Sequence, residues 1–405
     1  MINRELYLKK LKEFIDKPFI KVISGIRRSG KSALLKLVKE ELLKRGIEEQ
    51  NIIYLNFESF EFSEILSAKE LYAYVKEKIR THKKHYILLD EIQEVEAWEK
   101  AINSFAVDFN VDIYITGSNS KMLSGELATY LAGRDVEFPI YTLSFKEMLL
   151  FKATHHNIEP SNVYGNFETF LQMGGFPAIH NASYSVESAY QIVHDIYSSV
   201  ILRDVVQRNK IRDVELLERV VKYVFDNIGN KFSAKNVADY FKSQNRKLDL
   251  NTVYNYLNAL ESAFIIYRIP RYDIKGKELL KTNEKYFIGD QSLLYAVMGY
   301  NGRFISGILE NIVMLELKRR GYDVYVGKLD HTEVDFVAEQ ANKKIYIQVS
   351  YKMTEKATME REYKPLLAIK DNYRKYIITM DEHGHDTYEG IEHRHIADFL
   401  LMEDF

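Results

Sequence analysis

Cysteine is absent from this 405-residue chain, and proline is scarce, with only six residues. Without cysteine there is no disulfide, no thiolate nucleophile and no Cys-type zinc site, which fits a reducing compartment. No apolar run reaches the roughly 18 residues that a membrane-spanning helix requires. The N-terminal run MINRELYLKKLKEFIDK alternates charged and apolar residues, unlike the apolar core of a signal peptide. We therefore expect a cytoplasmic protein with no membrane partner.

Positive and negative residues are also nearly balanced, since the formal net charge is −2. The chain therefore lacks an overall nucleic-acid signature, and any basic surface must be local. The 46% hydrophobic and 28% charged residues describe a soluble globular protein. A chain of this length is too long for a single core, so several domains are expected.

The stretch from Gly25 to Ser32, GIRRSGKS, matches the phosphate-loop pattern G-x-x-x-x-G-K-[ST] without a gap. A β-branched apolar run at 19–23 precedes it, and apolar residues with helical spacing follow over 33–43. A strand, a glycine-bounded turn and a helix thus come in the order that the motif requires. The backbone N–H groups of such a loop hold anionic oxygens at a helix N-terminus. The sequence therefore predicts a nucleotide site for ATP and Mg²⁺.

Individual residues of this loop have distinct expected roles. Gly25 and Gly30 allow backbone angles and a close approach that a side chain would block. Lys31 can reach the β- and γ-phosphates, and the Ser32 hydroxyl can ligate Mg²⁺. The residues expected to contact the nucleotide through the loop are Gly25, Ile26, Arg27, Arg28, Ser29, Gly30, Lys31, Ser32 and Ala33.

Further strand-like runs alternate with helical ones, which predicts an α/β fold with a parallel, doubly wound sheet. The expected strands cover 51–57, 86–90, 111–116 and 136–143, with a helix over 67–80.

Polar residues end two of these strands, at the edge where open α/β sheets bind ligands. Asp90 would hold Mg²⁺ through its water shell, and Glu91 would orient and polarise the attacking water. The alternative is that both carboxylates simply begin a solvated loop. After the next strand, Ser118 and Asn119 are candidates to hydrogen-bond that water or the γ-phosphate, and an ordinary turn is the alternative.

Four runs together, GIRRSGKSALL, LLDEIQ, ITGSNS and LAGRDVEFPIYTLSF, resemble a known family. They look like the AAA-type ATPases of archaea and bacteria with a C-terminal domain of unknown function, and more broadly like AAA+ and STAND-type NTPases. The resemblance implies a sensor role for Ser118 or Asn119. It also makes Arg134 a candidate arginine finger, in cis or from a neighbouring subunit, with an exposed structural arginine as the alternative. Arg27 and Arg28 are also family-like, and we expect them either to gate the loop or to be solvated.

A winged-helix-like region is expected after a helical segment that begins with a capping box at Ser144. Ser233 and Asn251 are its expected helix caps. Its expected helices cover 234–241 and 253–262, and its expected wing strands 264–269 and 285–288. Five basic residues could meet DNA phosphates, with a protein partner as the alternative: Lys242, Arg246, Lys247, Arg268 and Arg271.

The C-terminal part of the chain resembles the restriction-endonuclease fold, whose metal site is built from a glutamate, an aspartate and an E-x-K triplet. Glu310 and Asp335 are present, but the triplet has Gln348 and Ser350 in place of the carboxylate and lysine. An amide and a hydroxyl cannot replace these groups at a phosphodiester site. The resemblance therefore implies the fold with an inactive site, although Lys352 continues the same strand face and could supply a lysine.

We thus expect an ATP-hydrolysing molecular switch that acts on DNA or on a protein partner. An oligomer is possible. The alternatives are an ATP-dependent DNA nuclease and a non-catalytic, ATP-stabilised scaffold. The expected domains are a P-loop ATPase domain at 1–145, a helical lid or linker at 146–212, a winged-helix-like domain at 213–300 and a nuclease-like α/β domain at 301–405.

Overall fold

The computed structural model describes residues 3–79, 83–120, 133–156, 162–243, 248–382 and 387–405. The chain divides into two compact units. The first unit comprises 1–140 with 262–264, and the second comprises 141–261 with 265–405. Within the described ranges, no helix combines the length and hydrophobicity that crossing a bilayer requires.

The first unit contains a five-stranded sheet with the order β2-β3-β4-β1-β5. Every pair of neighbouring strands in it is parallel. The strands are β1 (Ile20–Ser24), β2 (Ile52–Asn56), β3 (His85–Asp90), β4 (Val111–Gly117) and β5 (Asp135–Pro139). The predicted parallel sheet is confirmed. Its last strand ends earlier than expected, at Pro139.

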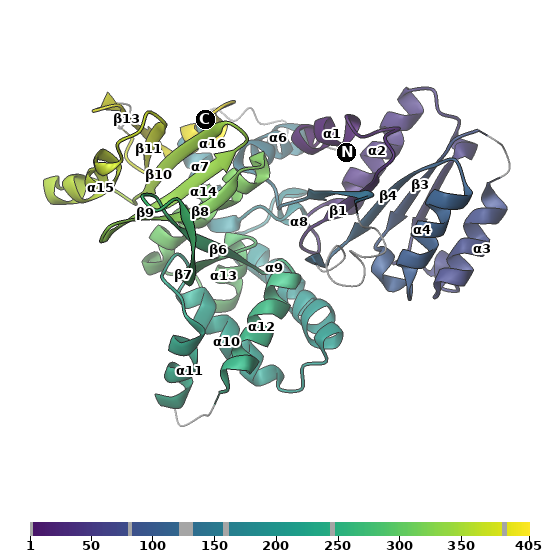
Figure 1. Cartoon of the computed structure of the whole chain (residues 1–405), viewed down its shortest axis with the longest axis horizontal. Helices are drawn as coiled ribbons and strands as arrows, with labels where there is room; N and C mark the ends of the chain where they lie inside the picture. Colours follow the sequence, from purple (N-terminus) through teal and green to yellow (C-terminus); the bar gives the residue numbers. More distant parts are fainter. Residues whose placement is uncertain (1–2, 80–82, 121–132, 157–161, 244–247, 383–386) are drawn as a thin grey trace. The chain divides into compact units, whose positions relative to one another are not determined.

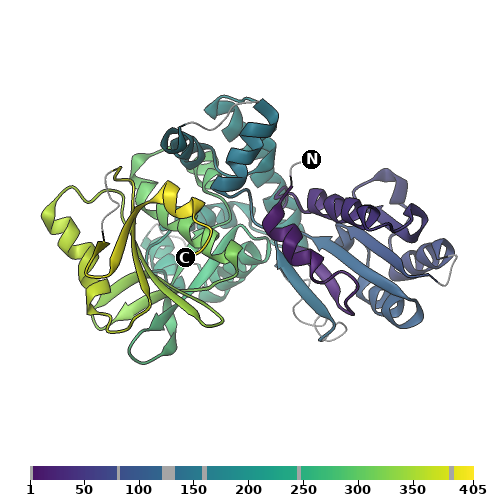
Figure 2. The same cartoon turned by 90° about the horizontal axis from the view of Figure 1, so that it is seen from above.

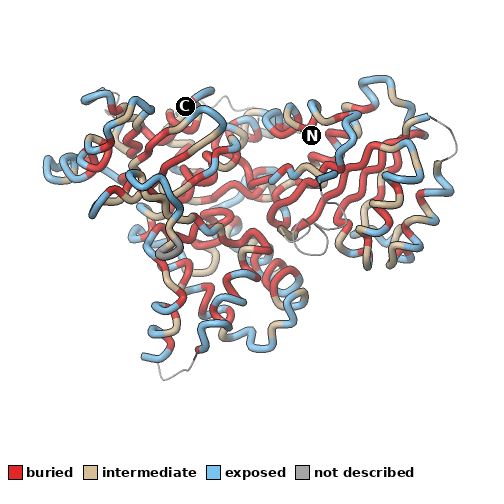
Figure 3. The backbone as a smooth tube through the Cα atoms, in the orientation of Figure 1, coloured by how far each residue is buried: buried red, intermediate tan, exposed pale blue. Residues whose placement is uncertain are grey.

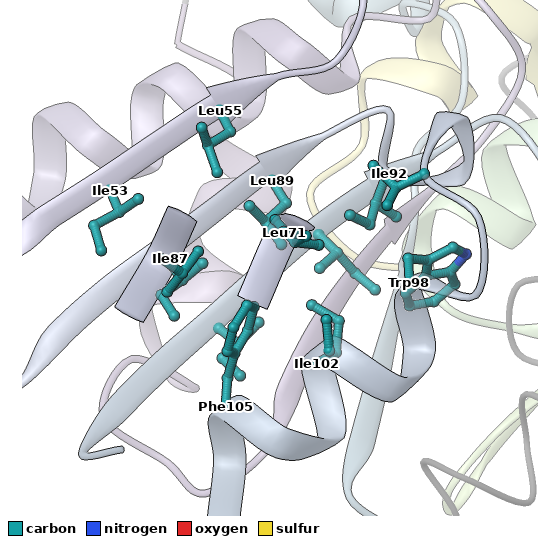
Figure 4. Packing of buried hydrophobic residues seen from close by; sticks show 14 of the residues in the cluster. Ile53, Leu55, Leu71, Ile87, Leu89, Ile92, Trp98, Ile102 and Phe105 are labelled. Atoms are coloured by element: carbon teal, nitrogen blue, oxygen red, sulfur yellow. The ribbon is translucent and has the colours of Figure 1, made fainter. Parts of the chain in front are cut away.

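Helices cover both faces of this sheet, as its doubly wound pattern predicts (Figures 1 and 2). They are α1 (Glu5–Lys12), α2 (Lys31–Lys44), α3 (Ala68–Lys78) and α4 (Trp98–Asp108), with short 3₁₀ turns at Glu49–Asn51, Phe60–Phe62 and Ile92–Glu94. Successive strand residues alternate between two cores. Figure 4 shows Ile87 and Leu89 of β3 facing Leu71, Ile102 and Phe105 of α3 and α4. Helices α1 and α2 pack on the other face.

The second unit begins with helices and ends with a mixed sheet. Its helices are α6 (Phe145–His156), α7 (Val163–Met173), α8 (Pro177–His180), α9 (Val186–Val200), a π-helix (Ile201–Gln207), α10 (Val214–Asp226), α11 (Ala234–Ser243), α12 (Leu250–Ser262), α13 (Gln291–Met298), a 3₁₀ turn (Gly302–Phe304), α14 (Ile305–Arg320), α15 (Lys356–Ala368) and α16 (Ile396–Leu401). In Figure 3 the strands are mostly buried, while the exposed segments lie in outer helices and loops.

The sheet of this unit has eight strands in the order β12-β13-β11-β10-β9-β8-β6-β7. The strands are β6 (Ile266–Asp273), β7 (Glu278–Ile288), β8 (Asp323–Leu329), β9 (Thr332–Gln340), β10 (Lys343–Val349), β11 (Arg374–Thr379), β12 (Thr387–Tyr388) and β13 (Ile391–His395). Beyond residue 320, β8 pairs antiparallel with β9, and β9 pairs antiparallel with β10.

The two expected wing strands form a longer hairpin than predicted and extend a larger sheet. β6 and β7 pair antiparallel, but β6 also pairs parallel with β8. The expected boundary at residue 300 therefore runs between strands of one sheet. A smaller difference concerns the helix cap before α12. The side chain of Asp249 accepts a hydrogen bond from the backbone of Asn251 at 3.0 Å, so Asn251 lies inside the helix and Asp249 caps it.

The break at Gly174-Gly175 is held by a buried carboxylate from a distant segment. Asp290 Oδ2 accepts a hydrogen bond from the Gly175 backbone at 2.8 Å. A side chain on Gly174, whose φ is +80°, would place its Cβ 2.1 Å from Asp290 Oδ1. Burial raises the pKa of Asp290 above its ordinary value, although hydrogen bonds from Ser292 and Thr142 oppose that rise. This contact explains Gly174 and fixes the chain path after α7. A side chain on Gly175 would instead place its Cβ 2.4 Å from the backbone oxygen of Leu143.

Candidate nucleotide-binding site

The phosphate-loop motif folds as predicted, between the end of β1 and the start of α2. A side chain on Gly25 would place its Cβ 2.1 Å from the backbone oxygen of Ile140, so only glycine fits there. Gly30 and Arg28 both have positive φ, of 101° and 67°. Strand, loop and helix are therefore in the expected order, and the loop backbone is tightly wound at the N-terminus of α2.

Lys31 lies at the first position of α2, and its side chain folds back over the loop. Its ammonium donates to the backbone oxygens of Gly25 at 3.1 Å and Ile26 at 3.3 Å. It also lies 3.4 Å from Glu91 Oε1. Because both side chains are almost fully buried, this pair is shielded from solvent. The sequence-predicted lysine and glutamate are thus brought together at one place.

Asp90 ends β3 beside the loop and is fully buried. Its Oδ1 accepts hydrogen bonds from Thr116 Oγ1 at 2.6 Å and from Ser32 Oγ at 3.1 Å. Its Oδ2 accepts from the Tyr54 hydroxyl at 3.1 Å. Burial raises the pKa of Asp90 above its ordinary value, and the hydrogen bonds from Thr116 and Ser32 oppose that rise. The two residues predicted to hold Mg²⁺, Ser32 and Asp90, are therefore adjacent.

Glu91 follows Asp90 in a left-handed backbone conformation, with φ of 55°. Its N–H donates to Thr116 Oγ1 at 2.9 Å, so one hydroxyl is bonded to both consecutive acidic residues. Burial alone would raise the pKa of Glu91. The Lys31 ammonium, a hydrogen bond from Gln93 and the Arg27 charge together hold that pKa below its ordinary value. Glu91 is therefore an ionised carboxylate at neutral pH, as a group that polarises water must be.

The two sensor candidates follow β4 at the same edge of the sheet. β4 lies between β3 and β1 and ends at Gly117, so Ser118 and Asn119 come directly after it. Ser118 is buried and Asn119 is half-buried. Their position is consistent with the sensor expectation, while their contact with a nucleotide stays a prediction.

Arg134 lies directly before β5, at the end of the parallel strands opposite to the phosphate loop. Its backbone oxygen accepts from Ile20 at 2.7 Å, at the start of β1, whereas the phosphate loop follows the end of that strand. The five residues of β1 span about 16 Å. The exposed guanidinium is 3.5 Å from Asn103 Oδ1. The structure therefore does not bring Arg134 to the phosphate loop of its own chain.

These residues fit a bound ATP with Mg²⁺ on three counts. The Ser29 hydroxyl is buried in the loop without a hydrogen-bond partner within the described ranges, as expected where a ligand supplies one. The Gly25 position leaves room for nothing larger than glycine. Ser32 and Asp90 offer a hydroxyl and a carboxylate, which are the oxygen donors that Mg²⁺ prefers.

A second polar cluster lies in the C-terminal sheet, where the sequence predicted a degenerate metal site. The ammonium of Lys285, from β7, lies 3.2 Å from Glu310 Oε2, 3.0 Å from Glu333 Oε1 and 3.6 Å from Asp335 Oδ1. Lys285 is 4% exposed. Across the part of the chain that the structure describes, no group of three or more histidine, cysteine or acidic residues is arranged to hold a metal ion.

Of the other residues of that predicted site, Gln348 is bonded to the cluster, because its Oε1 accepts the N–H of Asp335 at 3.3 Å. Gln348 donates to Glu362 Oε2 at 2.9 Å, and Asp335 Oδ2 accepts from the Val349 backbone at 2.9 Å. Ser350 follows β10, and Lys352 is exposed. The lysine beside Asp335 is therefore Lys285 and not Lys352.

The five predicted DNA contacts are not gathered on one described element. Lys242 is in the last turn of α11 and is exposed. Arg268 and Arg271 are on β6, and Arg268 is 3.7 Å from Glu261. Arg246 and Lys247 lie outside the described residues.

Four residues of the first site were not singled out from the sequence: Tyr54, Gln93, Thr116 and Glu58, whose carboxylate accepts a hydrogen bond from Arg27. Thr116 carried a usable signal, because it is a polar residue at the C-terminal end of an apolar strand, as Asp90 is. Tyr54 and Glu58 carried none, since their contacts depend on how β2 is placed beside β3.

Comparison with known proteins places the site in a family context. A model described as an AAA domain matches residues 17–149, and a model for a domain of unknown function matches 164–303. A Walker-type ATPase of Pyrococcus abyssi, PABY2304, has a similar fold, with a TM-score of 0.51 and 15% identity. The match covers 73% of this chain and 96% of that one.

Two relatives align along almost the whole chain. An uncharacterized protein of Haemophilus influenzae is 42% identical over 99% of both chains. The uncharacterized protein MJ1544 of Methanocaldococcus jannaschii is 30% identical, over 99% of this chain and 90% of its own. This protein, whose residues 17–149 match the AAA domain model, therefore belongs to one family with these two relatives.

Proposed function

We propose that this protein binds ATP with Mg²⁺ and hydrolyses it, and that the cycle acts as a molecular switch. One observation carries the proposal. Lys31 and Ser32 begin α2, Asp90 and Glu91 lie at the end of β3, and the two pairs meet at the carboxyl ends of the strands, next to a tightly wound loop. Such an arrangement combines a phosphate-binding cation, oxygen donors for a metal and an ionised carboxylate.

Each of these groups has a distinct task in phosphoryl transfer. The loop N–H groups and the Lys31 ammonium bind the phosphates and stabilise the charge that spreads over the γ-phosphate oxygens. Ser32 and Asp90 would hold Mg²⁺, which supplies charge neutralisation when bound. Glu91 accepts a hydrogen bond from the attacking water and orients it. Thr116 holds the Asp90 carboxylate and the Glu91 backbone in place, because its hydroxyl donates to Asp90 Oδ1 and accepts the N–H of Glu91.

The test is ATP turnover of the purified full chain, with and without duplex DNA, for the wild type, Lys31→Ala and Glu91→Gln. Nucleotide binding is measured in parallel by calorimetry. We expect Lys31→Ala to lose binding and Glu91→Gln to bind without turning over. If the wild type does not hydrolyse ATP, or if Glu91→Gln turns over at the same rate, hydrolysis at this site is refuted.

For the second unit we propose a helical lid or linker at 146–212, a winged-helix-like part that reaches residue 300, and an inactive nuclease-like part beyond it. Three helices, α10, α11 and α12, precede the β6–β7 hairpin, which is the order of a winged helix. The Lys285 ammonium lies among the acidic groups of the nuclease-like part, which disfavours a metal there. Either DNA or a protein is the partner, and the DNA arm of the turnover assay tells them apart.

We also propose that Arg134 acts as an arginine finger only from a neighbouring subunit. Arg134 lies at the start of the parallel strands, whereas the phosphate loop of its own chain follows their carboxyl ends. This distance supports an action on a neighbouring subunit. The proposal requires an oligomer in which the β5 edge of one copy meets the nucleotide site of another.

A further inference from the structure

Arg27 is an unusual residue of the phosphate loop, because its side chain is buried while that of its neighbour Arg28 is exposed. The Arg27 side chain is only 9% exposed, and its Nη1 donates a hydrogen bond to Oε1 of Glu58. Glu58 is 46% exposed. A buried guanidinium inside a phosphate loop requires an anionic partner, and here a carboxylate supplies it.

Glu58 comes from a different strand but lies at the same sheet edge as the nucleotide site. It follows Asn56, the last residue of β2, and its N–H donates to Asn56 Oδ1 at 3.0 Å. The neighbouring Phe57 donates its N–H to the backbone oxygen of Asp90 at 3.1 Å. The backbone around Glu58 is therefore anchored to β3, so its carboxylate stands at a fixed place beside the loop.

Arg27 also acts electrostatically on the proposed catalytic centre. Its charge is one of the causes that hold the pKa of Glu91 below its ordinary value. Two cations of the loop, Lys31 and Arg27, thus face the carboxylate that is assigned to water. Lys31 reaches Glu91 directly at 3.4 Å, whereas Arg27 is held by Glu58.

We propose that Arg27 recognises the γ-phosphate of ATP and that Glu58 is its partner when no γ-phosphate is present. The inference rests on the proposed nucleotide-binding function. A guanidinium presents a planar fork of donors that fits a carboxylate or a phosphate, and the fork facing one anion cannot face another. A terminal phosphate carries more negative charge and more acceptor oxygens than a carboxylate, so it displaces Glu58 as the partner of the guanidinium. ADP has no group at that place, and Arg27 then stays with Glu58.

This exchange would give the protein a chemical means of telling ATP from ADP. When Arg27 moves, Glu58 loses its counter-ion and becomes a solvated carboxylate. The segment from Phe57 to Leu66, which contains Glu58 and the 91% exposed Phe60, therefore experiences a change of charge balance with each cycle.

The experiment compares dissociation constants for ADP and for a non-hydrolysable ATP analogue, each with Mg²⁺, by isothermal titration calorimetry on the full chain. The variants are Arg27→Ala, Arg27→Lys, Glu58→Gln and the double variant Arg27→Ala with Glu58→Gln. Glu61→Gln, an exposed glutamate of the same segment, and Lys36→Ala, an exposed cation of α2, are the matched controls. Circular dichroism confirms that each variant is folded.

We expect Arg27→Ala to weaken the binding of the analogue about tenfold and the binding of ADP by less than about twofold. Arg27→Lys, which keeps the charge but loses the fork, should fall between wild type and Arg27→Ala. Glu58→Gln removes the competing carboxylate, so it should tighten the binding of the analogue about threefold to tenfold and leave the binding of ADP unchanged. That gain should vanish in the double variant, because the two residues act through each other.

The outcomes separate this inference from the function on which it rests. If the wild type binds both nucleotides, Lys31→Ala abolishes binding, and the Arg27 and Glu58 variants affect ADP and the analogue equally, the inference alone is overturned. If Glu58→Gln tightens the binding of the analogue even in the Arg27→Ala background, the proposed coupling between Arg27 and Glu58 is also overturned. If the wild type binds neither nucleotide, the proposed function falls, and this inference falls with it.

Discussion

The Lys31 ammonium and the Glu91 carboxylate are 3.4 Å apart, so the residue assigned to phosphate and the residue assigned to water are partners of each other. Both are buried, and the Coulomb interaction between them is therefore stronger than it would be in water. A nucleotide phosphate must compete with Glu91 for the same ammonium. The pair thus keeps two functional charges neutralised before substrate arrives.

A first prediction follows for Glu91→Gln. Replacing the carboxylate by a neutral amide removes the competitor for Lys31, so ATP should bind about threefold to tenfold more tightly. Turnover should fall at least about a hundredfold, because no carboxylate then polarises the attacking water. Calorimetry and a phosphate-release assay measure the two effects, with the exposed Glu96→Gln as control. Weaker ATP binding in Glu91→Gln would contradict this competition.

A second prediction concerns Thr116. Thr116→Val keeps the side-chain shape but removes the hydroxyl that bonds Asp90 and the Glu91 backbone, which leaves buried polar groups unsatisfied at a cost of about 1–3 kcal/mol. We expect a lower melting temperature and about tenfold or more slower turnover. Thr116→Ser, which keeps the hydroxyl, should recover most of both. Wild-type turnover in Thr116→Val would show that Asp90 and Glu91 do not need this support.

The third prediction tests whether Arg134 acts between subunits. Arg134→Ala should bind ATP as the wild type does and turn over about a hundredfold or more slowly. Mixing it with Glu91→Gln should restore part of the activity, because a mixed assembly pairs an intact site with an intact Arg134. Turnover of each variant alone is the control. A melting temperature lowered by Arg134→Ala with unchanged turnover would instead make Arg134 a structural residue.

A fourth prediction concerns pH and Glu310. Burial raises the pKa of Glu310 from 4.5 to about 8, despite the opposing charge of Lys285. The folded chain therefore keeps a proton on Glu310 in a range where the unfolded chain has lost it. Unfolding releases that proton, so this residue makes the free energy of unfolding fall as the pH rises between about 4.5 and 8.

Glu310→Gln should remove that part of the pH dependence, since an amide does not titrate. Melting temperatures measured by calorimetry at several pH values should fall less steeply for Glu310→Gln than for the wild type. The exposed Glu360→Gln serves as control and should follow the wild type. Parallel curves for Glu310→Gln and wild type would mean that Glu310 is ionised in the folded chain.

The fifth prediction is that the full chain does not cut DNA. An ammonium lies among Glu310, Glu333 and Asp335, and a divalent ion would have to displace it against the repulsion of like charges. Incubation with Mg²⁺ or Mn²⁺ and supercoiled, linear or branched DNA should leave the DNA intact. Cleavage that disappears in Asp335→Ala would overturn this and favour the nuclease alternative.

The nucleotide site was largely predictable because its parts are local in sequence. The glycines and Lys31 of the loop follow a strand and open a helix, and Asp90 ends an apolar strand, so each motif carries its own structural context. The strand order also places Asp90 at the same sheet edge as the loop. Arg134 was made a finger candidate by family resemblance alone, although it precedes the expected strand at 136–143 and so belongs at the other end of a parallel sheet.

The second unit was less predictable because its important contacts join distant segments. Lys285 was assigned to a wing strand, and no local pattern connects it with Glu310 or Asp335. The hairpin itself was visible as two apolar runs, but its pairing with β8 depends on a parallel crossover that periodicity cannot reveal. Asp290, which holds the break at Gly175, was missed for the same reason.

The parallel pairing of β6 with β8 has a consequence for how the chain is made. During synthesis the β6–β7 hairpin leaves the ribosome before β8 exists, and a two-stranded ribbon is at best marginally stable by itself. Its free edge must stay unpaired until α13, α14 and β8 have been translated, and an unpaired strand edge is prone to pair with other chains. Nascent chains released near residue 300 should therefore be the ones that depend most on chaperones, while those that extend beyond β10 already contain five neighbouring strands of the sheet.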